Sequence, residues 1–406
     1  MIQKWIAISL TTLSVLSISV RAQDANPASV EDRLKKLEQE LDSLRRENKQ
    51  LRQELGVPSP LVKAAGPVKE LKLGGYLQAQ AEFGDEGDAR WTGNAANDRF
   101  YVRRARLNAS GAFLEHVDFR LEVDFAGSLG EATGLRGQLT DGWANWNYYD
   151  FANVKVGQFF PVFGWEKRLS PTKLQAIEYS LAGDRLLPDR QLGAQLWGGF
   201  LEKRISYALG VFNGNNLNNN WNDNENFMLV PRLEGVPLQG KLFGQPARWS
   251  LAGTAYYSDD NRYPITPDLG IYSVANGYSG QTNVFVGQRT AAAFDTQLQI
   301  GRFDLWAEYL FTEYDPDGPA DTFNAQGWYV LAGYYIVPKK LQALAKYEQF
   351  DPNTDVARNA TDTWTLGVSY AIKGDNLKLY LNYLLMDVPG QEEWEQKLLL
   401  RLQAAF

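Results

Sequence analysis

The 406-residue chain contains no cysteine and only one histidine, His116. Without cysteine there is neither a disulfide framework nor a thiolate metal site. A single histidine leaves no cluster for zinc and no partner for a serine nucleophile. The sequence therefore predicts no catalytic site, no metal site and no cofactor.

An excess of positive charge and long apolar runs are also missing. The formal net charge of −7 at pH 7 provides no basic surplus to neutralise phosphates, so nucleic acid is not expected as a partner. Beyond the N-terminal segment no run of about eighteen apolar residues occurs, which excludes helical membrane spans and leaves a secreted soluble protein or an outer-membrane barrel. Aromatic residues, in contrast, make up 13% of the chain, and such an excess is typical of the girdles at membrane interfaces.

Residues 1–22 have the features of an export signal. Lys4 supplies the positive start, residues 5–20 form an apolar stretch, and Val20-Arg21-Ala22 is a small-x-small cleavage site. A membrane anchor is the alternative, but the apolar stretch is short and rich in hydroxyl groups. We expect the mature chain to begin at Gln23.

Residues 23–57 are predicted to form a coiled coil, because apolar residues recur at alternating spacings of four and three with charged residues between them. The seam consists of Val30, Leu34, Leu37, Leu41, Leu44, Asn48, Leu51 and Leu55. A single amphipathic helix packed on the domain is the alternative, although so narrow a stripe favours self-association. Asn48 occupies an a position, where a polar group fixes register and strand number. Glycines and prolines in residues 58–70 then form a linker.

From residue 71 to residue 406 the period of the pattern changes to two, as expected of strands with one apolar face. In the last strand the apolar face carries Leu398, Leu400, Leu402, Ala404 and Phe406, and the opposite face carries Lys397, Leu399, Arg401, Gln403 and Ala405. The sixteen predicted strands are 71–83, 98–113, 116–126, 139–149, 153–160, 191–199, 204–212, 226–236, 248–258, 291–300, 302–312, 327–336, 340–350, 362–372, 376–387 and 394–406.

The gaps between these strands are alternately long and short, which is typical of outer loops and periplasmic turns in an outer-membrane barrel. One gap, 237–247, is too long for a turn and marks an uncertain strand boundary. Sixteen apolar faces require a hydrocarbon partner, and a sheet in lipid must close to bond its edges. We therefore predict an all-β fold, a 16-stranded antiparallel transmembrane β-barrel in the bacterial outer membrane. Its lumen is expected to be filled with water and its N-terminal coiled-coil helix to lie in the periplasm.

The segment Val156–Glu166, VGQFFPVFGWE, resembles the signature of the phosphate-selective porin O and P family. Further matches are Arg103-Arg104-Ala105-Arg106-Leu107, Glu178 with Ser180-Leu181, and Pro188, Arg190 and Gly193. The resemblance, which covers about residues 71–406, implies a homotrimeric channel whose third outer loop folds inward and whose basic residues attract small anions such as phosphate. The chain departs from the pattern at Phe160, where the family commonly has lysine.

Basic residues of the loop and of the second predicted strand are the candidate pore-lining, anion-attracting side chains. They are Lys167, Arg168, Lys173, Arg185, Arg190, Arg104 and Arg106. Alternation also turns Arg120, Lys155, Arg232, Lys346, Lys378, Lys397 and Arg401 toward the lumen, together with Glu82, Asp118, Glu122, Asp124, Asp295, Asp304, Glu308 and Glu348. Two interpretations remain open: rings of charge that select anions, or ion pairs between neighbouring strands.

The leading functional prediction is a passive outer-membrane porin for small hydrophilic solutes, with a preference for anions or phosphate. A second hypothesis is a structural protein that tethers the membrane lipid to peptidoglycan through the coiled coil. A third is a secreted carbohydrate-active β-protein that uses its acids and its 12 tryptophans to bind sugar.

Overall fold

The computed structural model describes residue 43 and residues 68–88, 90–91, 98–128, 136–266, 269, 284–318 and 320–406. The chain divides into two compact units, Met1–Lys63 and Ala64–Phe406. Only Ser43 of the first unit is described, so the predicted signal peptide (1–22), coiled coil (23–57) and most of the linker (58–70) lie outside the described residues. Within the described residues, no helix is both long enough and apolar enough to cross a bilayer.

The second unit is a β-barrel with short helices in its loops. Its strands are β1 Val68–Gly84, β2 Arg99–Phe113, β3 Val117–Asp124, β4 Gln138–Trp146, β5 Asn153–Phe159, β6 Gln191–Phe200, β7 Ile205–Phe212, β8 Met228–Leu242, β9 Gln245–Pro264, β10 Val284–Ile300, β11 Phe303–Pro316, β12 Phe323–Val337, β13 Leu341–Asp351, β14 Thr361–Ala371, β15 Leu377–Asp387 and β16 Glu395–Ala405. The helices are η1 Ala126–Ser128, η2 Glu166–Arg168, η3 Pro171–Lys173 and α3 Leu181–Leu186.

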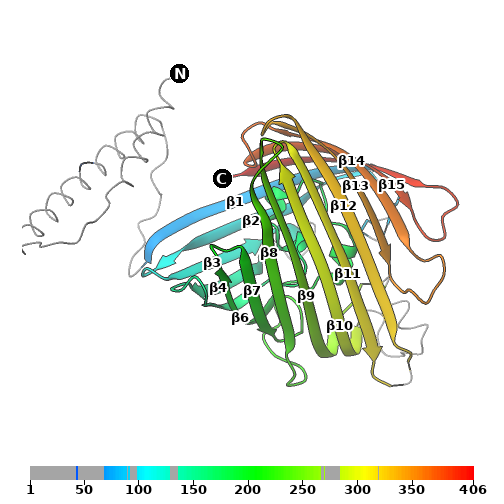
Figure 1. Cartoon of the computed structure of the whole chain (residues 1–406). Coiled ribbons are helices and arrows are strands. Elements are labelled where there is room, and N and C mark those ends of the chain that lie inside the picture. The colour runs from blue at the N-terminus through cyan, green and yellow to red at the C-terminus, as the bar shows by residue number, and fades with distance from the viewer. Residues whose placement is uncertain are drawn as a thin grey trace, which may run out of the picture. The chain divides into compact units, whose positions relative to one another are not determined.

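The sixteen strands form one closed antiparallel barrel (Figure 1). Each strand pairs with its neighbours in the sequence, and β1 closes the barrel against β16. The closure extends to the last residue, because the N–H of Gly75 donates to the carbonyl of Phe406 at 3.3 Å and the N–H of Phe406 donates to the carbonyl of Gly75 at 3.0 Å. No unpaired sheet edge is left between these two strands, as a barrel in lipid requires.

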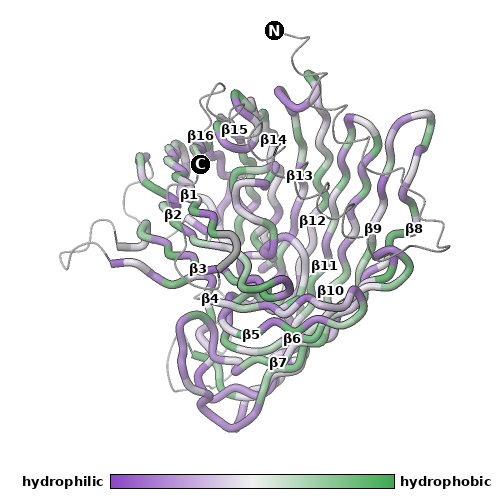
Figure 2. The backbone as a smooth tube through the Cα atoms, turned by 90° about the vertical axis from the view of Figure 1, so that its left-hand side faces the viewer, coloured by the Kyte–Doolittle hydropathy of each residue, from purple (hydrophilic) through white to green (hydrophobic). Residues whose placement is uncertain are grey.

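Side chains alternate between the outside and the inside of the barrel, as the period of two predicts. Leu77 and Leu402 face outward and are each 44% exposed, whereas their neighbours Gln78 and Gln403 face inward and are fully buried. Figure 2 shows the same alternation as polar and apolar residues taking turns along the strands. The outer surface is therefore suited to hydrocarbon and the inner surface to water.

All sixteen predicted strands are present, but several boundaries differ from the prediction, the largest differences being at the start of β10, which begins at Val284 and not at residue 291, and around the β8–β9 turn. β1 begins at Val68 and not at Leu71. The predicted gap at 237–247 is wrong, because β8 and β9 run through it and leave only Phe243 and Gly244 as a turn. Both turn residues have positive φ, 53° and 75°, as a tight two-residue hairpin needs. A register shift between Gly235 and Leu238 accommodates Pro237, the second of two prolines in β8, which has no N–H to donate to the ladder.

Candidate functional site at the loop inside the barrel

The segment between β5 and β6, residues 160–190, lies inside the barrel. Its carbonyl groups at Pro171 and Thr172 accept hydrogen bonds from Gln78 at 3.2 Å and from Gln403 at 3.1 Å. Gln78 and Gln403 belong to β1 and β16, the strands that close the barrel, and they also bond to each other at 2.8 Å. The segment, which we call the inner loop, therefore reaches from its own strands to the closing seam.

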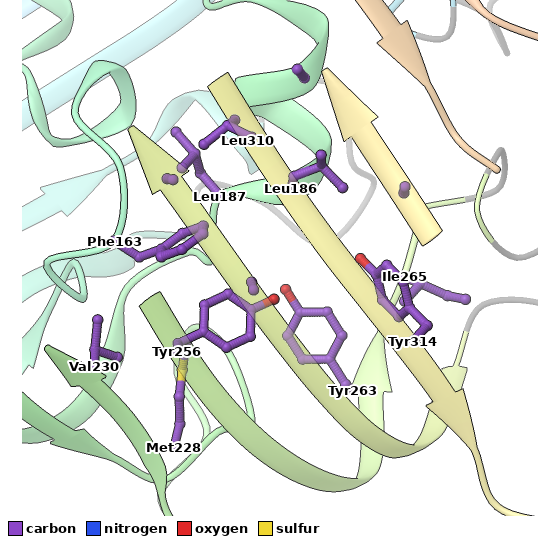
Figure 3. Close-up of a cluster of buried hydrophobic side chains, with 14 of the residues drawn as sticks. Phe163, Leu186, Leu187, Met228, Val230, Tyr256, Tyr263, Ile265, Leu310 and Tyr314 are labelled. Carbon is purple, nitrogen blue, oxygen red and sulfur yellow. The ribbon is translucent and has the colours of Figure 1, made fainter. Parts of the chain in front are cut away.

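Apolar side chains near the two ends of the inner loop pack it against the barrel wall. Phe163, Leu186 and Leu187 are 2–3% exposed and belong to a cluster with residues of β8 to β11 (Figure 3). The rings of Phe163 and Tyr256 meet edge to face, with 4.7 Å between their centroids. Burying a side chain of this size contributes about 1.5–3 kcal/mol, so this cluster is a main anchor of the loop.

Two buried carboxylates hold the start of the inner loop. Glu308 on β11 accepts the backbone N–H groups of Trp165 at 2.7 Å and of Glu166 at 3.1 Å. The carboxylate of Glu166 accepts from the N–H and the hydroxyl of Ser180 at 2.8 and 2.7 Å, which ties the start of the loop to the N-terminus of α3. Burial raises the pKa of Glu166 above its ordinary value, although Lys346 and the Ser180 bonds act in the opposite direction.

Three arginines surround Glu178, in the second half of the inner loop, and hold this part of the loop to the barrel wall. Nε of Arg103 lies 2.9 Å from one carboxylate oxygen, Nη2 of Arg104 lies 3.6 Å from the other, and Arg401 of β16 also pairs with this carboxylate. Burial alone would raise the pKa of Glu178, but the guanidinium groups of Arg103, Arg401 and Arg104 outweigh it and hold this pKa well below its usual range.

A β-bulge explains how two consecutive arginines of β2 both reach this carboxylate. The register of β1 on β2 shifts between Gln78, which pairs with Arg104, and Ala79, which pairs with Val102. Arg103 is the extra residue of the bulge, so it points inward where strict alternation would turn it to lipid. Sequence reasoning missed Arg103 as a lumen residue, because a strand pattern does not show where a bulge falls.

Ion pairs engage four of the predicted site residues. Arg106 pairs with Asp124 at 2.7 Å and with Glu122 at 3.1 Å. Arg190 pairs with Asp141 at 2.6 Å, Arg185 with Asp184 at 2.5 Å, and Arg104 with Glu178 as described above. For these four residues the structure favours pairing over an open ring of positive charge.

Other wall charges behave in the same way. Arg232 on β8 pairs with Asp295 at 2.7 Å, and Lys346 pairs with Glu348 at 2.7 Å. Arg120 pairs with Asp141 on the neighbouring strand β4 at 3.2 Å. The lumen therefore contains many ion pairs between or along strands, which keep its charged side chains in place.

Comparison with known proteins agrees with this architecture. The sequence model of the phosphate-selective porin O and P family matches residues 73–406. The chain belongs to this family. Porin O of Pseudomonas aeruginosa is 23% identical over 347 residues, which cover 80% of this chain and 76% of that protein. Family membership identifies the barrel as an outer-membrane porin.

Solved porin structures share the fold at low sequence identity. An anion-selective porin from Comamonas acidovorans has a TM-score of 0.56 at 12% identity, covering 83% of this chain and 99% of that one. The outer membrane channel DcaP of Acinetobacter baumannii has a TM-score of 0.56 at 16% identity, covering 85% and 100%. The trimer form of OmpT from Vibrio cholerae has a TM-score of 0.55 at 11% identity, covering 83% and 99%.

The porin's departure from its family pattern at Phe160 coincides with a specific contact. The guanidinium carbon of Arg190 lies 4.0 Å from the centroid of the Phe160 ring. A cation over an aromatic face is stabilised by the ring quadrupole. Phe160 therefore supports a cation of the inner loop at the position where the family commonly has a lysine of its own.

The other three predicted site residues of this porin, Lys167, Arg168 and Lys173, lie on the inner loop and form no ion pair with any described residue. Lys167 donates to the carbonyl of Leu187 and Arg168 to the carbonyl of Gly164, both at 3.1 Å. Arg168 and Lys173 are exposed, and each lines a cavity between the inner loop and the barrel wall.

On the wall, Lys155 likewise has no hydrogen bond or ion pair with the described residues. Its Nζ lies 4.4 Å from the centroid of the Trp143 ring. Sequence reasoning counted Lys155 only among the wall charges, because a strand pattern does not show which cations find partners.

Proposed function

We propose that the barrel is a water-filled channel through which small hydrophilic solutes diffuse passively across the outer membrane, with a preference for anions such as phosphate. Family membership supports the channel, and the distribution of unpaired charge supports the preference. The observation that carries it is that the unpaired cations Arg168 and Lys173 of the inner loop are exposed, whereas the unpaired acids Glu166 and Glu308 that hold the loop are buried.

Two acids that form no ion pair with the described residues, Glu166 of the inner loop and Glu308 of the wall strand that holds it, are buried away from water. Glu166 and Glu308 are 3% and 2% exposed and are hydrogen-bonded between the loop and the wall. The unpaired cations Arg168 and Lys173, in contrast, are exposed, and Lys155 is half-exposed. Positive charge at a water-accessible constriction raises the local concentration of anions, so the net charge of −7 for the whole chain does not decide selectivity.

The reversal potential across a planar bilayer in a salt gradient tests this preference, with chloride and phosphate compared. We expect a modest anion preference that weakens in the double variant Arg168→Gln with Lys173→Gln. The matched control is Arg204→Gln with Lys241→Gln, which removes two exposed cations from the end of the barrel with short turns. A cation-selective channel that responds to neither pair would contradict the proposal.

We also propose that the porin assembles as a homotrimer through the outer face of its closing strands. This face has an apolar recess of about 860 Å³ lined by residues of β1, β2, β14, β15 and β16. Small side chains at Ala79 and Ala81 leave the space, and Phe100 beside them is 80% exposed. A neighbouring copy that fills this recess would bury apolar surface in a contact that lipid tails fill less closely.

A further inference from the structure

A polar cavity of about 280 Å³ lies inside the barrel, between the inner loop, strands β9 to β13 and the start of β15. Lys173 and Gln175 of the loop line one side, and Arg248, Asp304 and Gln342 are among the residues that line the wall. Every residue of this cavity belongs to the described part of the chain. The cavity sits toward the barrel end that has the short turns, because Arg248 and Asp304 lie within a few residues of those turns.

Amide and carboxylate groups form a hydrogen-bonding network on one side of the cavity. Nε2 of Gln342 donates to Oε1 of Gln175 at 2.8 Å, and both amides lie 3.4 Å from Oδ2 of Asp304. The side chain of Gln342 is 1% exposed, yet its own Oε1 has no hydrogen-bond partner in the described part of the chain. A buried acceptor that lacks a donor favours a ligand that carries hydroxyl groups.

Cations outnumber carboxylates around the same cavity. Lys173 and Arg248 are exposed, and Nζ of Lys378 lies 3.9 Å from Asp375, at the outer limit of an ion pair. Among the described residues, Arg248 donates a hydrogen bond only to the hydroxyl of Ser250, at 3.3 Å. Guanidinium and ammonium groups without a close carboxylate partner favour a ligand with an anionic group.

Aromatic rings complete the lining. Trp306 on β11 lines the cavity and meets Trp165 of the inner loop edge to face, with 4.7 Å between the ring centroids. Tyr335 on β12 lines the cavity as well. Rings held at the edge of a polar cavity offer apolar faces against which the C–H face of a sugar ring packs.

We propose that this cavity is a transient binding subsite for small polyhydroxylated anions, a sugar phosphate or a sugar acid, on their way through the channel. The amides and Asp304 bind the hydroxyl groups, Lys173 and Arg248 bind the anionic group, and Trp306 packs on the ring. The inference rests on the proposed channel function and names a solute class that uses all three kinds of side chain at once.

Blockade of single-channel current in a planar bilayer tests the inference, with glucose 6-phosphate, glucuronate, glucose and inorganic phosphate added in turn to each side. We expect glucose 6-phosphate and glucuronate to block at about tenfold lower concentration than either glucose or phosphate, and more strongly from the side of the short turns. Equal potency of glucose 6-phosphate and inorganic phosphate would overturn it. A protein that inserts but conducts no current would instead contradict the proposed function.

Substitutions separate the contribution of the cations to solute binding from that of the aromatic rings. Lys173→Gln with Arg248→Gln should weaken block by glucose 6-phosphate and by phosphate, whereas Trp306→Leu should weaken block by the sugars but not by phosphate. Tyr335→Leu serves as a second aromatic variant in case the Trp306 change disturbs the inner loop.

The matched control is Arg204→Gln with Lys241→Gln, because both side chains are exposed at the same end and neither lines the cavity. We expect this control to leave block by every solute unchanged. Equal loss of phosphate block and sugar block in both aromatic variants would contradict a site for sugars.

Discussion

Glu178 is the single residue whose removal should disturb the inner loop most, because Arg103, Arg104 and Arg401 all converge on it. In Glu178→Gln the three guanidinium groups would repel one another without a neutralising charge. We expect the loop anchor to weaken by about 3–5 kcal/mol, the usual cost of removing one partner of a buried ion pair. Trypsin should then cleave the loop of the detergent-solubilised protein faster than it cleaves the wild type.

The control for this variant is Glu202→Gln, since Glu202 is exposed in the turn between β6 and β7. It should leave the cleavage rate of the inner loop unchanged. Wild-type resistance of Glu178→Gln would mean that the apolar cluster around Phe163 suffices to hold the loop.

The two loop carboxylates have opposite pKa shifts and so should respond to pH in opposite ways. The lowered pKa of Glu178 means that its contribution is complete above the ordinary glutamate pKa and is lost only as pH falls through the lowered value. The raised pKa of Glu166 means that its contribution is complete below that ordinary pKa and is lost as pH rises through the raised value. As pH rises above the ordinary glutamate pKa, Glu178 therefore stays engaged while the contribution of Glu166 to the stability of the loop falls.

Hydrogen exchange of residues 160–190, corrected for the intrinsic rate, measures this response. Protection in the wild type should fall as pH rises above the ordinary glutamate pKa, and in Glu166→Gln it should stay nearly constant, because glutamine keeps an acceptor for Ser180 but does not titrate. Equal slopes in the two proteins would contradict the assignment.

Among the elements, the inner loop depends on a backbone turn that only glycine adopts without strain. Gly164 has φ of +66°, and a Cβ there would overlap the side chain of Leu187 and the carboxylate of Glu308. Gly164→Ala should therefore lift the loop from the wall, at a cost of about 1–3 kcal/mol from backbone strain alone. We expect a larger and noisier open-channel current.

Gly240→Ala is the matched change, because that position has open space around it and no positive φ. Its current should equal that of the wild type. An unchanged current in Gly164→Ala would show that the loop does not limit conduction.

The strands could be predicted from sequence because their signal is local, and the inner loop could not because its contacts are distant. Each strand shows its two faces within ten or so residues, whereas its ends are less well marked, and the predicted gap that the structure lacks fell where Pro237 occupies a bulge. The contact of Ile177 with Asn382, by contrast, joins residues 205 positions apart.

The candidate site was predictable only in part. Sequence alone identified Arg168 and Lys173 as loop cations, but whether a cation is paired depends on which carboxylates other strands bring near it. Alternation likewise could not reveal the bulge that turns Arg103 inward. The positions of the candidate cations were thus predictable, but their partners were not.

At the scale of the whole molecule, the proposed trimer gives a prediction that separates the barrel wall from the coiled coil. Ala79→Trp would fill the apolar recess at the closing strands and should lower the temperature at which the trimer dissociates on a gel. Ala332→Trp, an outward position on the distant strand β12, is the control and should have no effect. Deleting residues 30–55 should leave the trimer intact, because we assign the association to the barrel wall; a monomer after that deletion would assign it to the heptads instead.

The most direct test of the whole account is the single-channel conductance of the detergent-purified protein in a planar bilayer. A closed barrel with apolar residues outside and polar residues inside should insert spontaneously and give discrete current steps that grow with salt concentration. Insertion without current, or a protein that stays folded and dispersed in buffer with no detergent, would contradict the account.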